Sequence, residues 1–150
     1  MTRRSEVRSC YGVALAEALA GLDEGGIPIG AALFRGEELI ATGRNRRVQD
    51  DDPILHAEMT CFRNAGRRTD YADLTLYSTL APCPMYTGAI LLFQVPRVVV
   101  GESRTFAGEL DLLRRRSVDV IVLDDAGSAQ LMRTMMSAHP ELWSEDIGGR

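Results

Sequence analysis

The chain has 150 residues, 45% of them hydrophobic and 25% charged, which fits one soluble globular domain built around a single core. Its net charge is −4 and its isoelectric point lies near 5.2, whereas proteins that bind nucleic-acid phosphates usually carry a basic surface. Two short basic clusters, residues 44–47 and 114–116, are therefore interpreted as solvated charges, and we do not expect a nucleic-acid partner.

The N-terminal sequence and the cysteine content indicate where in the cell the protein is expected. The polar N-terminus leads into an Ala-rich amphipathic stretch, unlike a signal peptide, and no apolar run reaches the roughly 18 residues that a membrane span requires. The three cysteines, Cys10, Cys61 and Cys83, are odd in number and widely spaced, so they do not indicate a disulfide framework. We expect a cytoplasmic protein with no membrane partner.

The first predicted elements are a helix and a β-hairpin. Apolar residues recur at helical spacing over Glu6–Leu22, and a Gly-Gly pair followed by proline ends this helix. Ile29–Phe34 and Leu39–Thr42 are predicted as strands joined by a tight turn. The acidic run Asp50–Pro53 is typical of a helix entrance, because acidic side chains favour the positive end of the helix dipole. It predicts a helix from about Ile54 to Ala65.

The second half of the chain alternates between strands and helices. Strands are predicted at Leu74–Ser78, Val98–Val100 and Val118–Leu123, helices at Pro84–Phe93, Gly108–Arg116 and Ala126–Ala138, and a short tail at Glu141–Ile147. A strand, helix, strand order makes the last two strands parallel. The whole pattern predicts an α/β fold over a single domain, residues 1–150: a three-layer α/β/α sandwich around a five-stranded mixed sheet.

Two segments carry residues suited to chemistry, His56-Ala57-Glu58 and Pro82-Cys83-Pro84-Met85-Tyr86, each at a predicted helix start. Taken alone, the first is most often a surface or capping pair, and Cys83 a core thiol. Together they resemble the H-x-E…P-C-x-x-C signature of zinc-dependent deaminases. Free N–H groups at a helix start stabilise anionic sulfur. Three protein ligands then leave the fourth zinc position to water, whose pKa falls to about 7.

The resemblance extends over nearly the whole chain. It is carried, in order, by the segments Glu24–Gly30, Gly43–Asn45, Leu76–Cys83, Thr87–Ile90, Pro96–Glu102 and Trp143–Gly148. These segments resemble the fungal-type cytosine deaminases of the cytidine and nucleobase deaminase superfamily, and the Trp…Glu-Asp-Ile-Gly ending is typical of that branch. The resemblance implies a cytidine deaminase-like fold, a zinc cofactor and a homodimer. The apolar run at the end of Pro84–Phe93, which exceeds what one helix face can bury, also favours a dimer.

Roles for individual residues are implied by the same resemblance. Glu58 would be the catalytic proton carrier, with His56 and Cys83 as metal ligands. The implied substrate contacts are the amide of Asn45, the carboxylate of Asp146, the backbone near Ala81, and an enclosure of the flat ring by Phe106 and Trp143 with Ile29 nearby. The residues alone leave other interpretations open, because Asn45 also suits a turn, Asp146 a solvated helix end and Trp143 simple core packing.

Tyr86 breaks the pattern, because the family has cysteine at this position. A phenol has an ordinary pKa near 10 against about 8.5 for a thiol, and its oxygen is a harder donor and lies further from the backbone. Three outcomes are open: Tyr86 binds the metal as a phenolate, Tyr86 turns aside while His56 and Cys83 hold a weaker metal, or the ring fills a site without metal. Cys61 is expected on another face of its helix and not as a replacement.

Three functions are compatible with these observations. The first is hydrolytic deamination of a small free base: cytosine or a related amino-pyrimidine, amino-triazine or purine. The second is a deaminase-fold protein with a depleted or absent zinc site, which binds a planar ligand or performs non-hydrolytic chemistry. The third is a tRNA adenosine deaminase, which the acidic composition and a C-terminal tail expected to cover the pocket disfavour.

Overall fold

Five strands form one mixed sheet in the computed structural model, which describes residues 3–148. The strands are β1 (Gly30–Arg35), β2 (Glu38–Arg44), β3 (Thr75–Leu80), β4 (Arg97–Glu102) and β5 (Asp119–Val122). Their order across the sheet is β2-β1-β3-β4-β5. β1 is antiparallel to both of its neighbours, whereas β3, β4 and β5 are parallel to one another. The predicted mixed sheet and its parallel last pair are confirmed.

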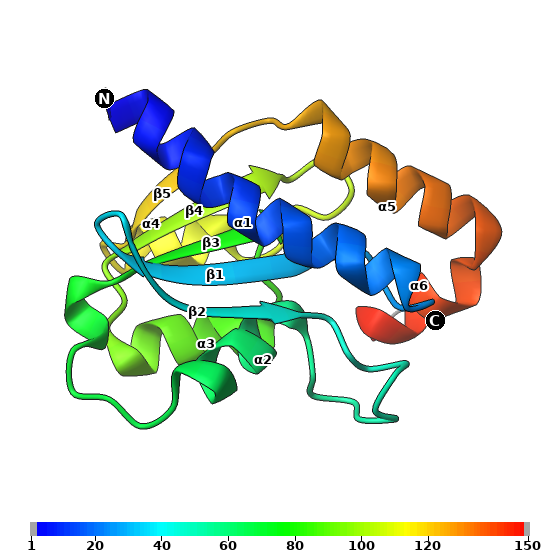
Figure 1. Cartoon of the computed structure of the whole chain (residues 1–150), viewed down its shortest axis with the longest axis horizontal. Coiled ribbons are helices and arrows are strands. Elements are labelled where there is room, and N and C mark those ends of the chain that lie inside the picture. The colour runs from blue at the N-terminus through cyan, green and yellow to red at the C-terminus, as the bar shows by residue number, and fades with distance from the viewer. Residues whose placement is uncertain (1–2, 149–150) are drawn as a thin grey trace.

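Helices cover both faces of this sheet (Figure 1). They are α1 (Arg3–Asp23), α2 (Ala57–Ala65), a short 3-10 helix η1 (Tyr71–Asp73), α3 (Pro84–Phe93), α4 (Leu110–Arg115), α5 (Ala126–Ala138) and α6 (Pro140–Asp146). α1 lies across one face, α2 and α3 lie on the other, and α5 with α6 lie beyond one end of the strands (Figure 1). The three-layer α/β/α architecture is therefore as predicted. No helix within residues 3–148 is long and apolar enough to cross a membrane.

Alternation along β1 divides the core between the two faces of the sheet. Ala31 and Leu33 pack in the larger core with α2 and α3, and Ala32 and Phe34 pack in the smaller core beneath α1. Gly43 of β2 allows α2 to approach closely, because a Cβ there would lie 2.3 Å from a backbone nitrogen of the helix. This close approach fixes the N-terminal end of α2 against the sheet.

The start of α2 differs from the prediction. The helix begins at Ala57 and not at Ile54, and the acidic residues before it form turns. The side chain of Asp52 accepts a hydrogen bond from the Ile54 amide at 3.0 Å, so the carboxylate stabilises a turn instead of a helix entrance. His56, inside the predicted helix, has extended backbone angles (φ −61°, ψ 158°), so the helix cannot include the residues before it. The predicted C-terminal tail is in fact mostly the helix α6.

Candidate active site

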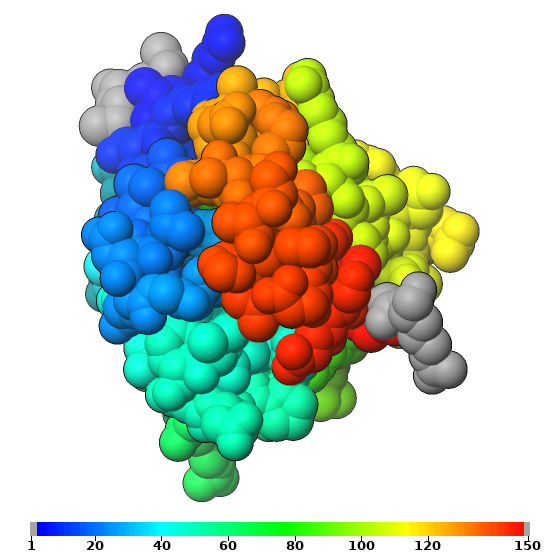
Figure 2. Space-filling view, turned by 90° about the vertical axis from the view of Figure 1, so that its right-hand side faces the viewer, coloured from blue at the N-terminus to red at the C-terminus, as the bar shows by residue number. Residues whose placement is uncertain are grey.

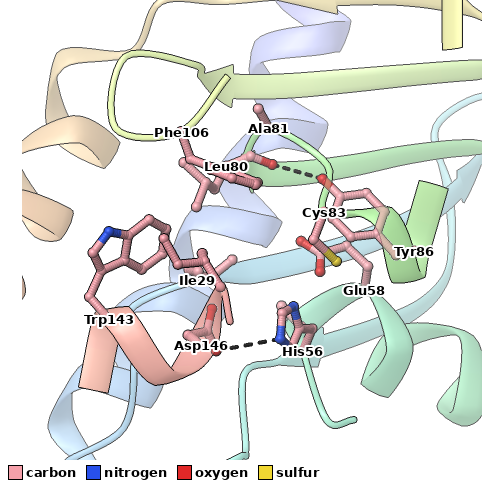
Figure 3. A pocket seen from close by; sticks show the side chains of 12 residues that line it. Ile29, His56, Glu58, Leu80, Ala81, Cys83, Tyr86, Phe106, Trp143 and Asp146 are labelled. Atoms are coloured by element: carbon pink, nitrogen blue, oxygen red, sulfur yellow. Dashed lines mark hydrogen bonds and ion pairs between the residues drawn. The ribbon is translucent and has the colours of Figure 1, made fainter. Parts of the chain in front are cut away.

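The helices α2 and α3 both begin beside the end of β3. The residue that directly precedes each helix lines the same pocket. His56 directly precedes α2, and Cys83 directly precedes α3, where Pro84 takes the first helical position. Glu58 lies in the first turn of α2 and Tyr86 in the first turn of α3. The structure thus brings the two chemical segments of the sequence together, and Figure 3 shows all four side chains around one pocket, with the Tyr86 hydroxyl directed to Leu80.

Glu58 is almost completely buried, with 2% of its surface exposed. The Ser78 hydroxyl donates a hydrogen bond to its Oε1 at 2.5 Å. Burial raises the pKa of Glu58 to about 7, although the Ser78 hydrogen bond opposes that shift. A carboxyl group with a pKa near neutrality can both take up and release a proton under ordinary conditions.

His56 lies between Glu58 and the C-terminal helix. Its Nε2 is 3.5 Å from Oδ1 of Asp146 in α6. Burial lowers the pKa of His56, whereas the charge of Asp146 opposes that shift, so the direction favours a neutral imidazole. A neutral imidazole held through one nitrogen presents the other as a lone-pair donor, which is the usual form of a metal-binding histidine.

Tyr86 does not point to a shared metal position. Its hydroxyl donates a hydrogen bond to the backbone carbonyl of Leu80 at 2.8 Å, and its ring is 2% exposed. Burial, assisted by the nearby charge of Glu58, raises the pKa of the phenol well above its ordinary value, so Tyr86 remains neutral. Figure 3 shows the ring extending past Cys83 as far as Leu80.

A zinc centre with three protein ligands does not fit this arrangement. The Tyr86 oxygen is already committed to a carbonyl, so only His56 and Cys83 remain as donors, below the three that are usual for catalytic zinc. No group of three or more His, Cys, Asp or Glu side chains within residues 3–148 is arranged to hold a metal ion. Cys61 instead donates to the Ala41 carbonyl at 3.4 Å and does not line the pocket, as expected.

The predicted substrate contacts gather around the same pocket. Its wall includes Ile29, Ala81, Phe106, Trp143 and Asp146 together with the four side chains already described. Phe106 and Trp143 meet edge to face, with ring centroids 6.1 Å apart and an interplanar angle of 83°. The cavity measures only about 10 Å³, about the space that one water molecule needs, so a ring enters only if part of the wall moves.

Asn45 is the one predicted site residue that does not line the pocket. Its amide nitrogen donates to Oδ1 of Asp146 at 2.9 Å, and its side-chain oxygen accepts from the backbone amide of Arg47 at 3.1 Å. Asn45 therefore contacts the pocket through Asp146. The amide serves partly as a turn residue and partly as a support for the carboxylate that faces the cavity.

Arg47 was not predicted as part of the site. Its side chain is 10% exposed, and its guanidinium lies 3.5 Å from both Asp146 and Glu145 of α6. Arg47 also donates to the Pro53 carbonyl at 3.1 Å. Figure 2 shows the red C-terminal segment resting against the turquoise segment that contains this arginine. The net negative charge of the chain favoured the interpretation that the basic cluster at residues 44–47 is solvated. No local sequence pattern indicates a pairing between residues so distant in sequence.

Comparison with known proteins places these residues in a family context. The family model of the cytidine and deoxycytidylate deaminase zinc-binding region matches residues 5–102. The chain is 43% identical over 139 residues to the cytosine deaminase of Candida albicans, covering 91% of this chain and 93% of that protein. It is also 37% identical over 103 residues to a tRNA-specific adenosine deaminase of Streptococcus pyogenes, covering 67% of this chain and 60% of that protein.

Solved structures agree on the fold. A guanine deaminase from Nitrosomonas europaea superposes with a TM-score of 0.75 at 24% identity, covering 85% of this chain and 83% of that chain. A structure from a study of tRNA:A34 deaminases superposes with a TM-score of 0.70 at 26% identity, covering 83% and 99%. The cytidine deaminase-like fold expected from the sequence is therefore confirmed.

Proposed function

The chain belongs to the cytidine and deoxycytidylate deaminase family, and from this premise we propose that it hydrolytically deaminates a small free heterocyclic base. The observation that carries the proposal is the placement of Glu58. This carboxyl group is buried in the pocket wall, is oriented by Ser78, and has a pKa raised to about 7. Such a group suits proton transfer between water and a leaving amine.

The proposed reaction uses Glu58 twice. The group first removes a proton from water while the water oxygen bonds to the ring carbon that carries the amine. Glu58 passes this proton to the adjacent ring nitrogen, which takes up the electron pair of the ring carbon–nitrogen double bond. It then moves the remaining hydroxyl proton to the amine nitrogen, so the bond to the amine breaks, ammonia leaves and the carbon–oxygen double bond of the lactam forms. Ser78 keeps the carboxylate oriented through its hydrogen bond. No step is assigned to a metal, because the donors present do not complete a zinc centre.

We propose that the base is recognised by packing against its flat ring and by hydrogen bonds to the edges of that ring. Phe106 and Trp143 provide aromatic surface for a planar ring, and Ile29 provides an aliphatic wall. The carboxylate of Asp146 is proposed to accept a hydrogen bond from the exocyclic amine, and the backbone around Ala81 to meet another edge of the ring. The identity to a cytosine deaminase over nearly the whole chain favours cytosine as the first base to test. Other amino-pyrimidines, amino-triazines and purines follow.

A polynucleotide substrate fits the surface less well. Within the basic cluster, Arg44 is paired with Glu17 at 2.7 Å, and Arg46 is paired with Asp50 at 2.9 Å. These carboxylates neutralise charge that a phosphate backbone would need. The helix α6 also covers the pocket, so a base attached to a long chain has less access than a free base. We propose a small-molecule substrate in a cytoplasmic protein.

We also propose a homodimer. Leu92 and Phe93 at the end of α3 are 77% and 37% exposed, and Ile54 is 55% exposed. Ile54 and Phe93 border an apolar groove of about 560 Å³ that continues along α2. A second copy of the chain would cover this surface, as expected for apolar area of this kind in a self-complementary interface.

A second function is favoured by Tyr86. Because the Tyr86 hydroxyl is bonded to Leu80, the site lacks a third metal donor, but its walls suit a planar ligand once part of the wall moves. A protein of this kind would bind a base without hydrolysing it. Binding without ammonia release would distinguish this function from the first.

The test of the proposed function is ammonia release measured over a panel of free bases, beginning with cytosine. Glu58→Gln removes the proton carrier while retaining the size of the side chain, so it is expected to abolish most of the release. Zinc content per chain is measured in parallel and is expected to be unchanged, because Glu58 is not a ligand. Equal turnover in the parent and in Glu58→Gln would refute the assigned role.

A further inference from the structure

The loop between β4 and α4 is tied at both ends to the segment that follows β3. At its start, the Glu102 carbonyl accepts a hydrogen bond from the Ala81 amide at 3.0 Å. At its end, the Glu109 amide donates to the Pro82 carbonyl at 2.9 Å. Phe106 lies between these two ties and lines the pocket. The loop is thus attached to the pocket wall at both ends and carries one aromatic ring into it.

The inside of this loop is organised by the side chain of Glu102. Its Oε2 accepts hydrogen bonds from the backbone amides of Arg104 at 2.8 Å and Thr105 at 3.0 Å. The residue is fully buried, and its Oε1 has no hydrogen-bond partner within residues 3–148. The two hydrogen bonds therefore hold the backbone of residues 104 and 105 against a side chain that is buried in the fold.

Gly108 closes the loop and leaves it little freedom. Its φ is +59°, and a Cβ at this position would lie 2.2 Å from the Pro82 carbonyl oxygen. Only glycine is accommodated there without a shift of the backbone. The path of the loop is therefore fixed by Glu102 at one end and by Gly108 at the other.

Phe106 directly follows Thr105, the second of the two residues whose amides Glu102 binds. Its ring and that of Trp143 from α6 meet edge to face, with centroids 6.1 Å apart. We propose that Glu102 is a positioning residue, which holds Phe106 at the pocket so that its ring faces the bound base. This inference rests on the proposed function for its ligand, but the placement of Phe106 is testable without any ligand.

The first measurement uses the ligand-free protein. Trp143 is the single tryptophan of the chain, so its fluorescence reports on its contact with Phe106. Glu102→Leu removes both hydrogen bonds, and Glu102→Asp keeps the charge but shortens the reach to the two amides. Both are expected to shift Trp143 emission toward that of Phe106→Ala and to speed hydrogen exchange at Arg104 and Thr105 by at least roughly tenfold.

Two matched variants complete this measurement. Glu102→Gln keeps an acceptor oxygen and is expected to retain most of the parent emission and exchange. Arg104→Ala removes an exposed ion pair with Asp124 from the same turn and is expected to change neither, because the backbone amide of residue 104 remains. Unchanged emission and exchange in Glu102→Asp would overturn the proposal. Glu102→Asp also serves as the test if Glu102→Leu fails to fold.

The second measurement is the affinity for cytosine in the Glu58→Gln background, where turnover is blocked. Glu102→Asp is expected to weaken binding about tenfold, and less than about twofold once Phe106 is alanine, because residues that act together are not additive. An undiminished effect in the Phe106→Ala background would overturn the proposal. If every protein fails to bind cytosine and the other bases of the panel while emission and exchange respond as expected, the proposed function fails and the positioning of Phe106 stands.

Discussion

The Tyr86 hydroxyl and the Leu80 carbonyl form a buried hydrogen bond of 2.8 Å. The Ser78 hydroxyl also lies 3.1 Å from the same carbonyl, but a hydroxyl has one proton, and the contact of Ser78 with Glu58 is shorter at 2.5 Å. Tyr86 therefore satisfies the carbonyl while Ser78 serves the carboxylate. This division of donors explains how the buried tyrosine is accommodated at this position.

Tyr86→Phe separates hydrogen bonding from metal ligation. Removing the hydroxyl leaves the Leu80 carbonyl with the weaker contact to Ser78, so we expect a loss of about 1 kcal/mol in the free energy of unfolding. The zinc content per chain is expected to stay the same, because the phenol is not a ligand. Chemical denaturation and elemental analysis measure the two effects, and a fall in zinc in Tyr86→Phe would instead identify a phenolate ligand.

Glu58→Gln should change the pH dependence of stability. Because burial raises the pKa of folded Glu58 from its ordinary 4.5 to about 7, its contribution is fully present below pH 4.5 and is lost as the pH rises through about 7. Glutamine does not titrate. The stability of Glu58→Gln relative to the parent should therefore increase from pH 5 to pH 8, by on the order of 2 kcal/mol.

Thermal unfolding with a metal chelator present measures this difference. Glu145→Gln, the same exchange at a position that is 65% exposed, is the control and should show no such trend. Parallel stability curves for Glu58→Gln and the parent between pH 5 and pH 8 would show that Glu58 does not titrate in this range.

Local patterns predicted most of the fold. The bounds of α3 and α5 match the predictions, because Pro84 marks one helix start and Asp125, whose side chain accepts from the Ser128 amide, caps the other. The predicted start of α2 at Ile54 was wrong. The Asp52 side chain accepts a backbone hydrogen bond there, as it would at a helix entrance, but the bond stabilises a turn.

The site was predictable to a different extent. His56 and Cys83 lie within a motif that predicted their places at helix starts, and the structure brings them together in one pocket. Arg47 was missed because its burial depends on a helix from the far end of the chain. The role of Glu102 was equally hidden, since its partners are backbone amides, which carry no sequence signal.

Truncation before Trp143 tests whether α6 covers the pocket. Trp143 and Asp146 of α6 both line the cavity and are among the residues proposed to contact the base. A chain ending at Leu142 is expected to bind cytosine at least about tenfold more weakly, while its melting temperature falls by only a few degrees, since a lid contributes more to the ligand than to the core. Loss of cooperative folding in this truncated chain would support simple core packing instead.

Leu92→Glu tests the proposed dimer. A charge at this exposed apolar position should disrupt an interface formed by α3, and the variant is expected to be monomeric by light scattering at micromolar concentration. Leu39→Glu, at a 49% exposed leucine of β2, is the control and should remain dimeric. A parent chain that is itself monomeric at this concentration would contradict the dimer.

Tyr86→Cys tests the central claim, that this is a deaminase site lacking its third metal donor. The cysteine would lie three residues after Cys83 in the first turn of α3, where i and i+3 share a face and free N–H groups favour a thiolate. It would also remove a ring from the pocket wall.

The decisive measurement is zinc per chain together with ammonia release from cytosine, for the parent and Tyr86→Cys side by side. The account predicts less than one zinc per chain in the parent, and higher zinc occupancy and faster release in the variant. A parent that already holds one zinc per chain and releases ammonia faster than Tyr86→Cys would contradict it, because Tyr86 would then be a working part of the metal site.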